Sequence, residues 1–453
     1  METAPVPRLV LSLALPAMVA QFVNVLYSIV DRMYIGNIPG IGDIALAGVG
    51  VCGPIVTLLS SFSALVGLGG APLMSMRMGE KNPRGAEQIL SNCFLMLVGL
   101  AVALTTGFLL SKEALLWAFG ASAATFPYAE QYLTIYTAGT FFALLASGLN
   151  NFIVCQGRAL LGMCSILIGA VCNIVLDPIF IFALGMDVAG AAWATVLSQF
   201  ASCLFVVGAL LHRKMAVRIT LGGYRLRIMR RVAAFGLSPF LIIATDSILL
   251  IALNTVLQRY GGEQGDLLIT GATIVQSYMT LITMPMAGIT GGTQPILSYN
   301  YGAKRTDRIR QGVKWILILC VVFTSVMFAL SYIAPRVFVG VFTQQREVID
   351  LSVWGIQVFT MMIIPLAFQY TFVDALTALG QVKRSVTFSL LRKSLFLVMT
   401  LALPAFFGAR AAFYAEPICD GAAAVISSTG FLLLFGGLMR RREQMPDGEA
   451  LYQ

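Results

Sequence analysis

Residues 169–182, GAVCNIVLDPIFIF, carry an amide and a carboxylate in a segment apolar enough to lie in lipid. Asn173 and Asp177 are four residues apart, so on a helix their side chains share a face. Pro178 lacks an N–H, and we therefore expect the helix to kink there and to leave the carbonyl of Ile174 available. A carboxylate with amide and carbonyl oxygens suits a hard cation or a proton. The alternative is a structural polar pair that satisfies the kink.

The composition indicates the environment of this segment. The chain has 453 residues, of which 58% are hydrophobic and 11% charged, and its mean hydropathy is +0.85. A soluble protein would carry about 25% charged residues. The sequence therefore predicts an all-α polytopic membrane protein, in which an acid at the bilayer centre costs about 2.5–3.5 kcal/mol and rarely persists without a function.

Other kinds of chemistry have little support in the sequence. The eight cysteines form no CxxC pair or zinc spacing, and the single histidine, His212, begins a basic loop. No nucleophile–base pair is apparent, which disfavours an intramembrane enzyme. The glycine clusters GLGGAP (67–72) and GITGGTQP (288–295) lack a Walker lysine, so we expect them to serve close helix packing or hinge motion rather than to bind ATP.

Apolar segments of spanning length, roughly 17–25 residues, recur twelve times along the chain. The expected spans are 9–32, 44–70, 89–111, 126–153, 159–184, 188–211, 232–258, 267–292, 312–334, 348–378, 385–408 and 412–438. With the N-terminus in the cytoplasm, 24 of the 30 Lys and Arg residues, Arg392 and Lys393 among them, are assigned to cytoplasmic loops. The positive-inside rule then places both termini in the cytoplasm and explains the net charge of +9 without nucleic acid.

The chain also contains an internal repeat. Residues 70–88, GAPLMSMRMGEKNPRGAEQ, align without a gap with residues 293–311, TQPILSYNYGAKRTDRIRQ, at an offset of 223. Six spans in each half give the two copies the same orientation. We therefore expect two pseudo-symmetric six-helix lobes around a central cavity, a design typical of transporters, although channels also contain repeats. The expected domains are an N-lobe (1–211), a basic linker (212–231), a C-lobe (232–440) and a cytoplasmic tail (441–453).

Several motifs resemble one transporter family. IVDRMYIGN closes the first span, SMRMGEKNPRGAEQ follows the second, NIVLDPIFIF lies in the fifth and GAAWATVLSQ in the sixth. Together with SYNYGAKRTDRI and YAEPICD in the second half, this order is similar to the MATE (multidrug and toxic compound extrusion) family, in its bacterial multidrug-efflux branch. The resemblance implies a secondary antiporter that exports cationic, amphipathic drugs or toxic organic compounds in exchange for H+ or Na+ by alternating access.

The resemblance also implies site residues in the N-lobe. The family places a cation or proton site on the positions of Asn173 and Asp177, its first-helix acid falls on Asp31, and Thr195 matches a site hydroxyl. From the residues alone, Asp31 lies beside Arg32 near the outer interface and could equally form an interfacial salt bridge. Asn150 and Asn151 are both amide candidates, and Asn151 is favoured because the offset places it on Asp374. A sodium ion would lie at Asp31, Asn173 and Asp177.

The C-half contains further acids, with an open assignment. Tyr370 and Asp374 share a helix face, and some family members place sodium on a Tyr and an Asp at this spacing, near a seventh-helix acid at the position of Asp246. That acid is usually Glu, and the shorter Asp puts direct coordination in doubt. Asp246 and Asp374 could equally be counter-charges for a cationic substrate, and Glu416 and Asp420 in YAEPICD add to this set.

These observations define the expected protein. It is a monomeric antiporter of the cytoplasmic membrane that contacts lipids, takes organic cations as substrates, and needs no cofactor beyond the coupling ion. The alternative is a flippase for lipid-linked intermediates, which would need a more basic cavity to hold pyrophosphate, whereas the intramembrane charges here are mostly acidic. A passive channel would be distinguished by drug uptake measured with and without an ion gradient.

Overall fold

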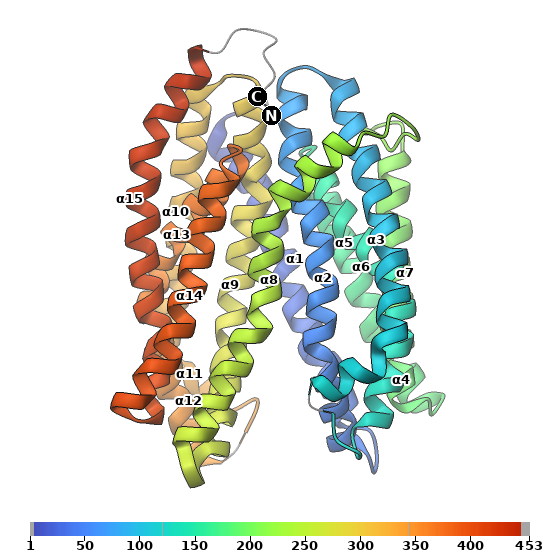
Figure 1. The fold of residues 1–453 in the computed structure, drawn as a ribbon, viewed down its shortest axis with the longest axis vertical. Helices are drawn as coiled ribbons and strands as arrows, with labels where there is room; N and C mark the ends of the chain where they lie inside the picture. The colour runs from blue at the N-terminus through green and yellow to red at the C-terminus, as the bar shows by residue number, and fades with distance from the viewer. Residues whose placement is uncertain (1–3, 120, 344, 445–453) are drawn as a thin grey trace. The chain divides into compact units, whose positions relative to one another are not determined.

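The computed structural model describes residues 4–119, 121–343 and 345–444, and within these ranges it contains helices and no strand. The α-helices are α1 (Val6–Gly36), α2 (Gly42–Gly79), α3 (Pro83–Ala118), α4 (Phe126–Ala138), α5 (Thr140–Val154), α6 (Ala159–Pro178), α7 (Asp187–Leu211), α8 (Leu226–Gly261), α9 (Gly265–Gly302), α10 (Thr306–Ile333), α11 (Pro335–Val339), α12 (Arg346–Phe359), α13 (Ile363–Ala378), α14 (Val382–Phe407) and α15 (Ala415–Gln444). Short π or 3-10 segments, η1 to η4, lie between some of them (Figure 1).

The expected membrane spans are present. Eleven helices in the described part of the chain are long and apolar enough to cross a bilayer, and the pair α4 and α5, bent by 55° at Gly139, makes a twelfth. The helices extend beyond the expected spans, as in α2, which runs on to Gly79. The prediction of an all-α polytopic membrane protein is confirmed.

The backbone conformation also shows the internal repeat. Lys81 and Lys304, which are 223 positions apart, are both non-glycine residues in the left-handed region, with φ of 57° and 56°. Gly157 and Gly380 repeat this relationship, with φ of 80° and 77°. A lysine with positive φ is uncommon, so its recurrence at equivalent helix ends is a structural signature of the repeat.

The chain divides into two compact units, each with its own helices. Unit 2 comprises residues 19–244, and unit 1 comprises residues 1–18 and 245–453. The boundaries therefore lie inside α1 and α8, whereas the sequence placed them at the linker 212–231. The difference arises because two long helices each contribute one half to either unit. Residues 445–453 of the expected tail lie outside the described residues.

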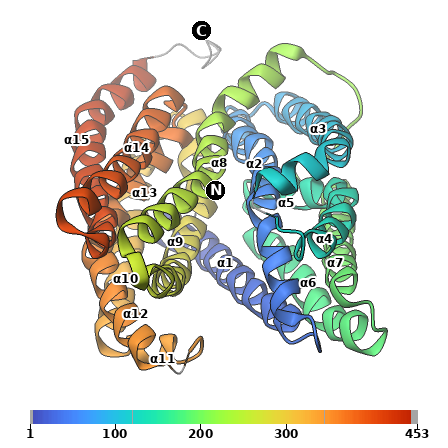
Figure 2. The ribbon, with the colours of Figure 1, turned by 60° about the horizontal axis from the view of Figure 1, so that its bottom comes forward.

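Unit 2 is packed through glycines, and Figure 2 shows α2, α3, α5, α6 and α7 in this part of the molecule. A Cβ at Gly236 of α8 would overlap the carbonyl of Leu65 on α2, and a Cβ at Gly69 would also be too close to the carbonyl of Val232. Gly70 leaves room for the ring of Phe152. The GLGGAP cluster thus lets backbones approach closely, as expected from its small residues.

The basic linker is fastened to unit 2. The Gln156 side chain bonds both the N–H and the carbonyl of Val217, at 2.9 and 3.0 Å. Asn92 accepts a hydrogen bond from the Arg225 N–H at 2.8 Å and donates to the Gly223 carbonyl at 3.3 Å. These amide side chains satisfy backbone groups that irregular structure leaves open.

In unit 1 the two described ends of the chain lie at the same end of the helices. Arg308 donates to the carbonyl of Ala4 at 2.7 Å, and the nearby Thr306 hydrogen-bonds to Glu443. Arg442 donates to the carbonyl of Tyr301 at 2.8 Å. A chain with an even number of membrane spans has both ends on the same side of the membrane, which agrees with these contacts.

Candidate functional site

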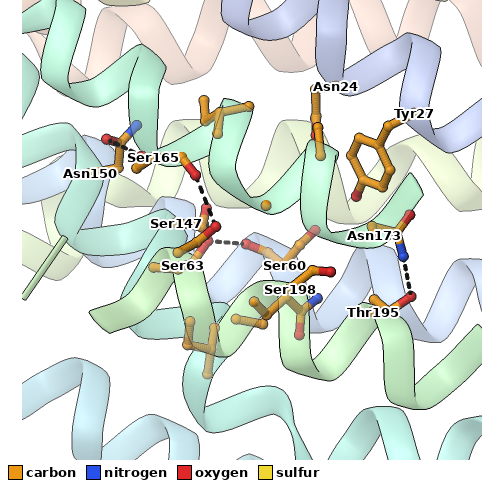
Figure 3. A pocket seen from close by; sticks show the side chains of 18 of the residues that line it. Asn24, Tyr27, Ser60, Ser63, Ser147, Asn150, Ser165, Asn173, Thr195 and Ser198 are labelled. Atoms are coloured by element: carbon orange, nitrogen blue, oxygen red, sulfur yellow. Dashed lines mark hydrogen bonds between the residues drawn. The ribbon is translucent and has the colours of Figure 1, made fainter. Parts of the chain in front are cut away.

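A polar cavity of about 350 Å³ lies within unit 2 (Figure 3). Its walls come from α1, α2, α4, α5, α6 and α7, and they carry amides, hydroxyls and two tyrosines but no charged side chain among the described residues. The polar lining is Gln21, Asn24, Tyr27, Ser60, Ser63, Tyr136, Thr140, Ser147, Asn150, Asn151, Ser165, Asn173, Thr195, Ser198, Gln199 and Ser202. Such a surface can hold water and solvate an ion or a polar ligand inside an apolar helix bundle.

Asp177 lies immediately behind this wall. Its side chain is fully buried, and the Asn173 amide donates to its Oδ1 at 3.2 Å. The same amide donates to the Thr195 hydroxyl at 3.4 Å, as Figure 3 shows. The Thr195 hydroxyl in turn donates to the carbonyl of Ala191 at 3.0 Å. The structure therefore brings together three of the residues predicted from sequence, with Asn173 as the link between the cavity and the carboxyl group.

Asp31 joins this group from α1. Its carboxyl lies close to that of Asp177, and Tyr27, one turn before Asp31 on α1, lies near both acids. Two adjacent carboxyl groups repel one another when both are ionised, so a proton or a cation between them is favoured.

Three buried oxygens in this cluster have no hydrogen-bond partner among the residues that the structure describes: Asp31 Oδ1, Asn173 Oδ1 and Asp177 Oδ2. Unsatisfied oxygens in an apolar interior cost free energy unless a proton or cation fills the gap. Two carboxyls and an amide oxygen form a donor set that fits H+ or Na+. These groups belong to the same three residues that the family resemblance predicts to hold sodium.

The expected kink at Pro178 takes a different form. The α-helix continues through Pro178 and then widens into a five-residue π-helix, η1, from Ile179 to Ala183. The Leu184 N–H bonds the carbonyl of Ile179 at 2.9 Å, five residues back. The wider turn accommodates the missing N–H of Pro178, and π-turns of this kind often lie at functional positions.

The two asparagines of α5 both line the cavity. Asn150 accepts a hydrogen bond from Ser165 at 3.0 Å, and Asn151 donates to the carbonyl of Ser147 in its own helix at 3.1 Å. Among the described contacts, neither amide is bonded to Asp177. Both belong to the cavity wall, one helix away from the acid pair.

The acids of the C-half form a second cluster, in unit 1, around a buried arginine. Arg392 of α14 donates from Nε to Asp420 at 2.8 Å and from Nη2 to Glu416 at 2.7 Å. Its side chain is 13% exposed, and that of Asp420 is fully buried. Glu416 and Asp420 are one turn apart on α15, so one guanidinium can bridge both.

The next residue along α14 neutralises another acid. Lys393 forms an ion pair with Asp246 of α8. The positive-inside count assigned Arg392 and Lys393 to a cytoplasmic loop, and this assignment is wrong: both lie near the middle of the membrane helix Val382–Phe407. The physical reason is that each is compensated by acids on neighbouring helices, which makes intramembrane cations tolerable.

The remaining C-half residues lie nearby. Tyr370 lies, partly buried, close to Arg392, Asp246, Asp420 and Glu416. Asp374 lies close to the side chains of Thr290 and Gln294 of α9, without a basic partner among its described contacts. Tyr370 and Asp374 therefore share a helix face, as the spacing predicts, but face different neighbours.

Sequence reasoning missed two kinds of residue. Tyr27 precedes Asp31 by four positions, the same spacing that drew attention to Tyr370 and Asp374, so this signal was available. Arg392 and Lys393 stand inside the expected span 385–408, and that position alone could have marked them as paired intramembrane cations.

Comparison with known proteins identifies the class. A sequence model of the MatE family matches residues 16–179 and 243–402, which lie in both halves of the repeat. With its twelve candidate spans and duplicated backbone, the protein is a multi-pass membrane transporter and not an enzyme. The chain belongs to the MATE family, and the resemblance of its motifs is confirmed.

Relatives and solved structures agree with this assignment. The multidrug export protein MepA of Staphylococcus aureus (strain MSSA476) is 24% identical over 434 residues, 94% of either chain, and that of Staphylococcus haemolyticus (strain JCSC1435) is 23% identical over 426 residues, 92% of either chain. An outward-facing MATE family transporter of the MOP superfamily has a TM-score of 0.90 at 22% identity, covering 96% of this chain and 97% of its own. A MOP superfamily transporter from Pyrococcus furiosus Vc1 (DSM3638) has a TM-score of 0.89 at 22% identity with the same coverage. The fold is thus the two-lobe fold of MATE transporters.

Proposed function

We propose that this protein is a secondary antiporter that exports cationic, amphipathic organic compounds in exchange for H+ or Na+ by alternating access. The observation that carries the proposal is the pairing of Asp31 with Asp177 next to Asn173 in unit 2. The names of the staphylococcal relatives, multidrug export proteins, support the substrate class.

The coupling step in this proposal takes place at the acid pair. When the site is empty, the buried carboxyls repel one another, and a proton or a sodium ion relieves that repulsion. Because Asp31 lies on α1 and Asp177 on α6, ion binding draws these two helices together. The membrane potential contributes about 2.3 kcal/mol per charge for every 100 mV, which is enough to drive substantial accumulation.

The polar cavity provides the route to this site. Its amides and hydroxyls can hydrate an ion up to Asn173, which bonds directly to Asp177. The same groups can hydrogen-bond the polar parts of an organic substrate.

The proposal includes the setting of the transporter. It acts as a monomer in the cytoplasmic membrane, surrounded by lipid, with both termini in the cytoplasm and no cofactor beyond the coupling ion. The shared position of Ala4 and Glu443 at one end of unit 1 supports termini on the same side.

The decisive experiment is transport by the purified protein in vesicles, with the sodium and proton gradients imposed separately. Ethidium export that requires one gradient supports the proposal and names the ion. Ethidium flux that runs equally without either gradient indicates a passive channel. Absence of ethidium flux together with translocation of a lipid-linked pyrophosphate would favour a flippase instead.

A further inference from the structure

Two adjacent cations of α14 are held in different ways. Arg392 bridges two acids that are themselves buried, because Glu416 is 13% exposed and Asp420 is fully buried. Lys393 pairs with Asp246, whose side chain is 50% exposed. Arg392 is therefore held by acids inside the protein, whereas Lys393 pairs with an acid that remains accessible.

We propose that Lys393 is an internal competitor for the substrate cation at Asp246, and that it sets which cations the transporter accepts. This inference rests on the proposed function, since it assumes that organic cations are the substrates. A substrate gains access to Asp246 only by displacing the Lys393 ammonium from it.

The contrast in hydrogen bonding explains why Lys393 can be displaced and Arg392 cannot. The Arg392 guanidinium makes two charge-assisted hydrogen bonds, at 2.8 and 2.7 Å, in a fixed planar geometry. The Lys393 ammonium is a point charge on a flexible stem and has one carboxylate partner among its described contacts. A substrate cation that replaces the Lys393 ammonium keeps the Asp246 carboxylate paired with one positive charge.

The exchange has consequences for selectivity. To displace Lys393, a substrate cation must bind at Asp246 with a more favourable free energy than the lysine ammonium does. Apolar contact area contributes to that free energy in addition to charge, so small hydrophilic cations compete poorly. Tyr370, which lies near Asp246 and is partly exposed, offers an aromatic ring to such a substrate. Lys393 in this role sets specificity and takes no part in ion coupling.

The test measures equilibrium binding of tetraphenylphosphonium, a permanent organic cation without hydrogen-bond donors, to the purified full-length protein. Lys393→Met frees Asp246 and is expected to tighten binding by about threefold to tenfold, the range that an ion pair of this exposure represents. Lys393→Gln provides a second variant in case the methionine impairs folding, and Lys393→Arg, whose guanidinium holds a carboxylate more firmly than an ammonium does, is expected to bind no more tightly than the wild type.

Two controls separate this effect from a change in folding. Lys393→Met combined with Asp246→Asn is expected to lose the gain, because the carboxylate is gone. Lys112→Met removes a lysine that pairs with Glu130 at 2.8 Å in unit 2, and its binding is expected to match the wild type. A thermal unfolding curve for each variant verifies that it is folded.

The possible outcomes distinguish a failure of this inference from a failure of the proposed function. Wild-type binding that is unchanged or weakened by both Lys393→Met and Lys393→Gln overturns the inference and leaves the proposed function standing. Absence of tetraphenylphosphonium binding in the wild type and in both Lys393 variants overturns the inference together with the proposed cation specificity. A gain that survives Asp246→Asn also overturns the inference, since the freed site would then be another group.

Discussion

Asp31 on α1 and Asp177 on α6 lie with their carboxyl groups close to one another, and each keeps one buried oxygen without a hydrogen-bond partner in the described part of the chain. This arrangement depends on both carboxyl groups. A lone buried carboxyl can be protonated and remain so, whereas a pair changes its repulsion each time a proton or cation arrives or leaves. The pair is therefore the part of unit 2 best suited to respond to an ion gradient.

The first prediction concerns Asp177. We expect Asp177→Asn to abolish ion-driven ethidium export in vesicles while leaving the unfolding temperature equal to or above that of the wild type, because the amide removes charge repulsion from a buried site. Asp31→Asn is expected to act in the same way, and the double variant is expected to be no worse than either single one.

The control for this prediction is Asp187→Asn. Asp187 is an exposed acid in the same unit with φ of 48°, a conformation that asparagine tolerates. Its export is expected to match the wild type. Ion-driven export by Asp177→Asn at the wild-type rate would remove this carboxyl from the coupling step.

The second prediction concerns Asn173, whose amide contacts both Asp177 and Thr195. We expect Asn173→Leu to reduce export by about tenfold or more, since a hydrogen bond to a charged group contributes about 1.5–3 kcal/mol. Thr195→Val is expected to have a smaller effect, because the hydroxyl mainly bonds its own helix at Ala191. Vesicle export rates for the two variants provide the comparison, and an equal loss in both would contradict this ranking.

Much of the fold could be predicted because its signals are local. Long apolar segments determine the spans, and the repeat at an offset of 223 is visible in the residues themselves. The same signals nominated Asn173 and Asp177, whose spacing on one helix brings them together whatever surrounds them. The proximity of Asp31 to this pair came from family resemblance, since no local pattern connects α1 with α6.

The features that sequence could not supply depend on partners distant along the chain. Arg392 and Lys393 look like loop cations until Glu416, Asp420 and Asp246 are seen beside them. The π-turn after Pro178 is one of several ways for a helix to absorb a proline, and packing against α7 selects it. Unit boundaries inside α1 and α8 likewise follow from packing rather than from local composition.

The third prediction tests the buried arginine. Arg392→Ala leaves Glu416 and Asp420 together without their counter-charge, and we expect it to lower the free energy of unfolding by about 3 kcal/mol or more. Arg336→Ala is the matched control, because its pair with Asp350 at 3.2 Å is 75% and 67% exposed and contributes less than about 1 kcal/mol. Thermal unfolding in detergent measures both, and similar stabilities for the two variants would contradict a buried ion-pair cluster.

The fourth prediction tests the glycine packing of unit 2. Gly236→Ala places a methyl group against the backbone carbonyl of Leu65, and a backbone atom cannot move aside as a flexible side chain can. We expect α8 to separate from α2 at this point, with a loss of about 2 kcal/mol or more in stability, as for other overpacked sites.

Gly99→Ala in α3 is the control, since a Cβ there meets nothing within 4 Å. Because alanine favours a helix over glycine by about 1 kcal/mol, Gly99→Ala is expected to be neutral or stabilising. Unfolding temperatures measured on the two purified variants provide the test, and a stable Gly236→Ala protein would show that α2 and α8 are farther apart than the structure indicates.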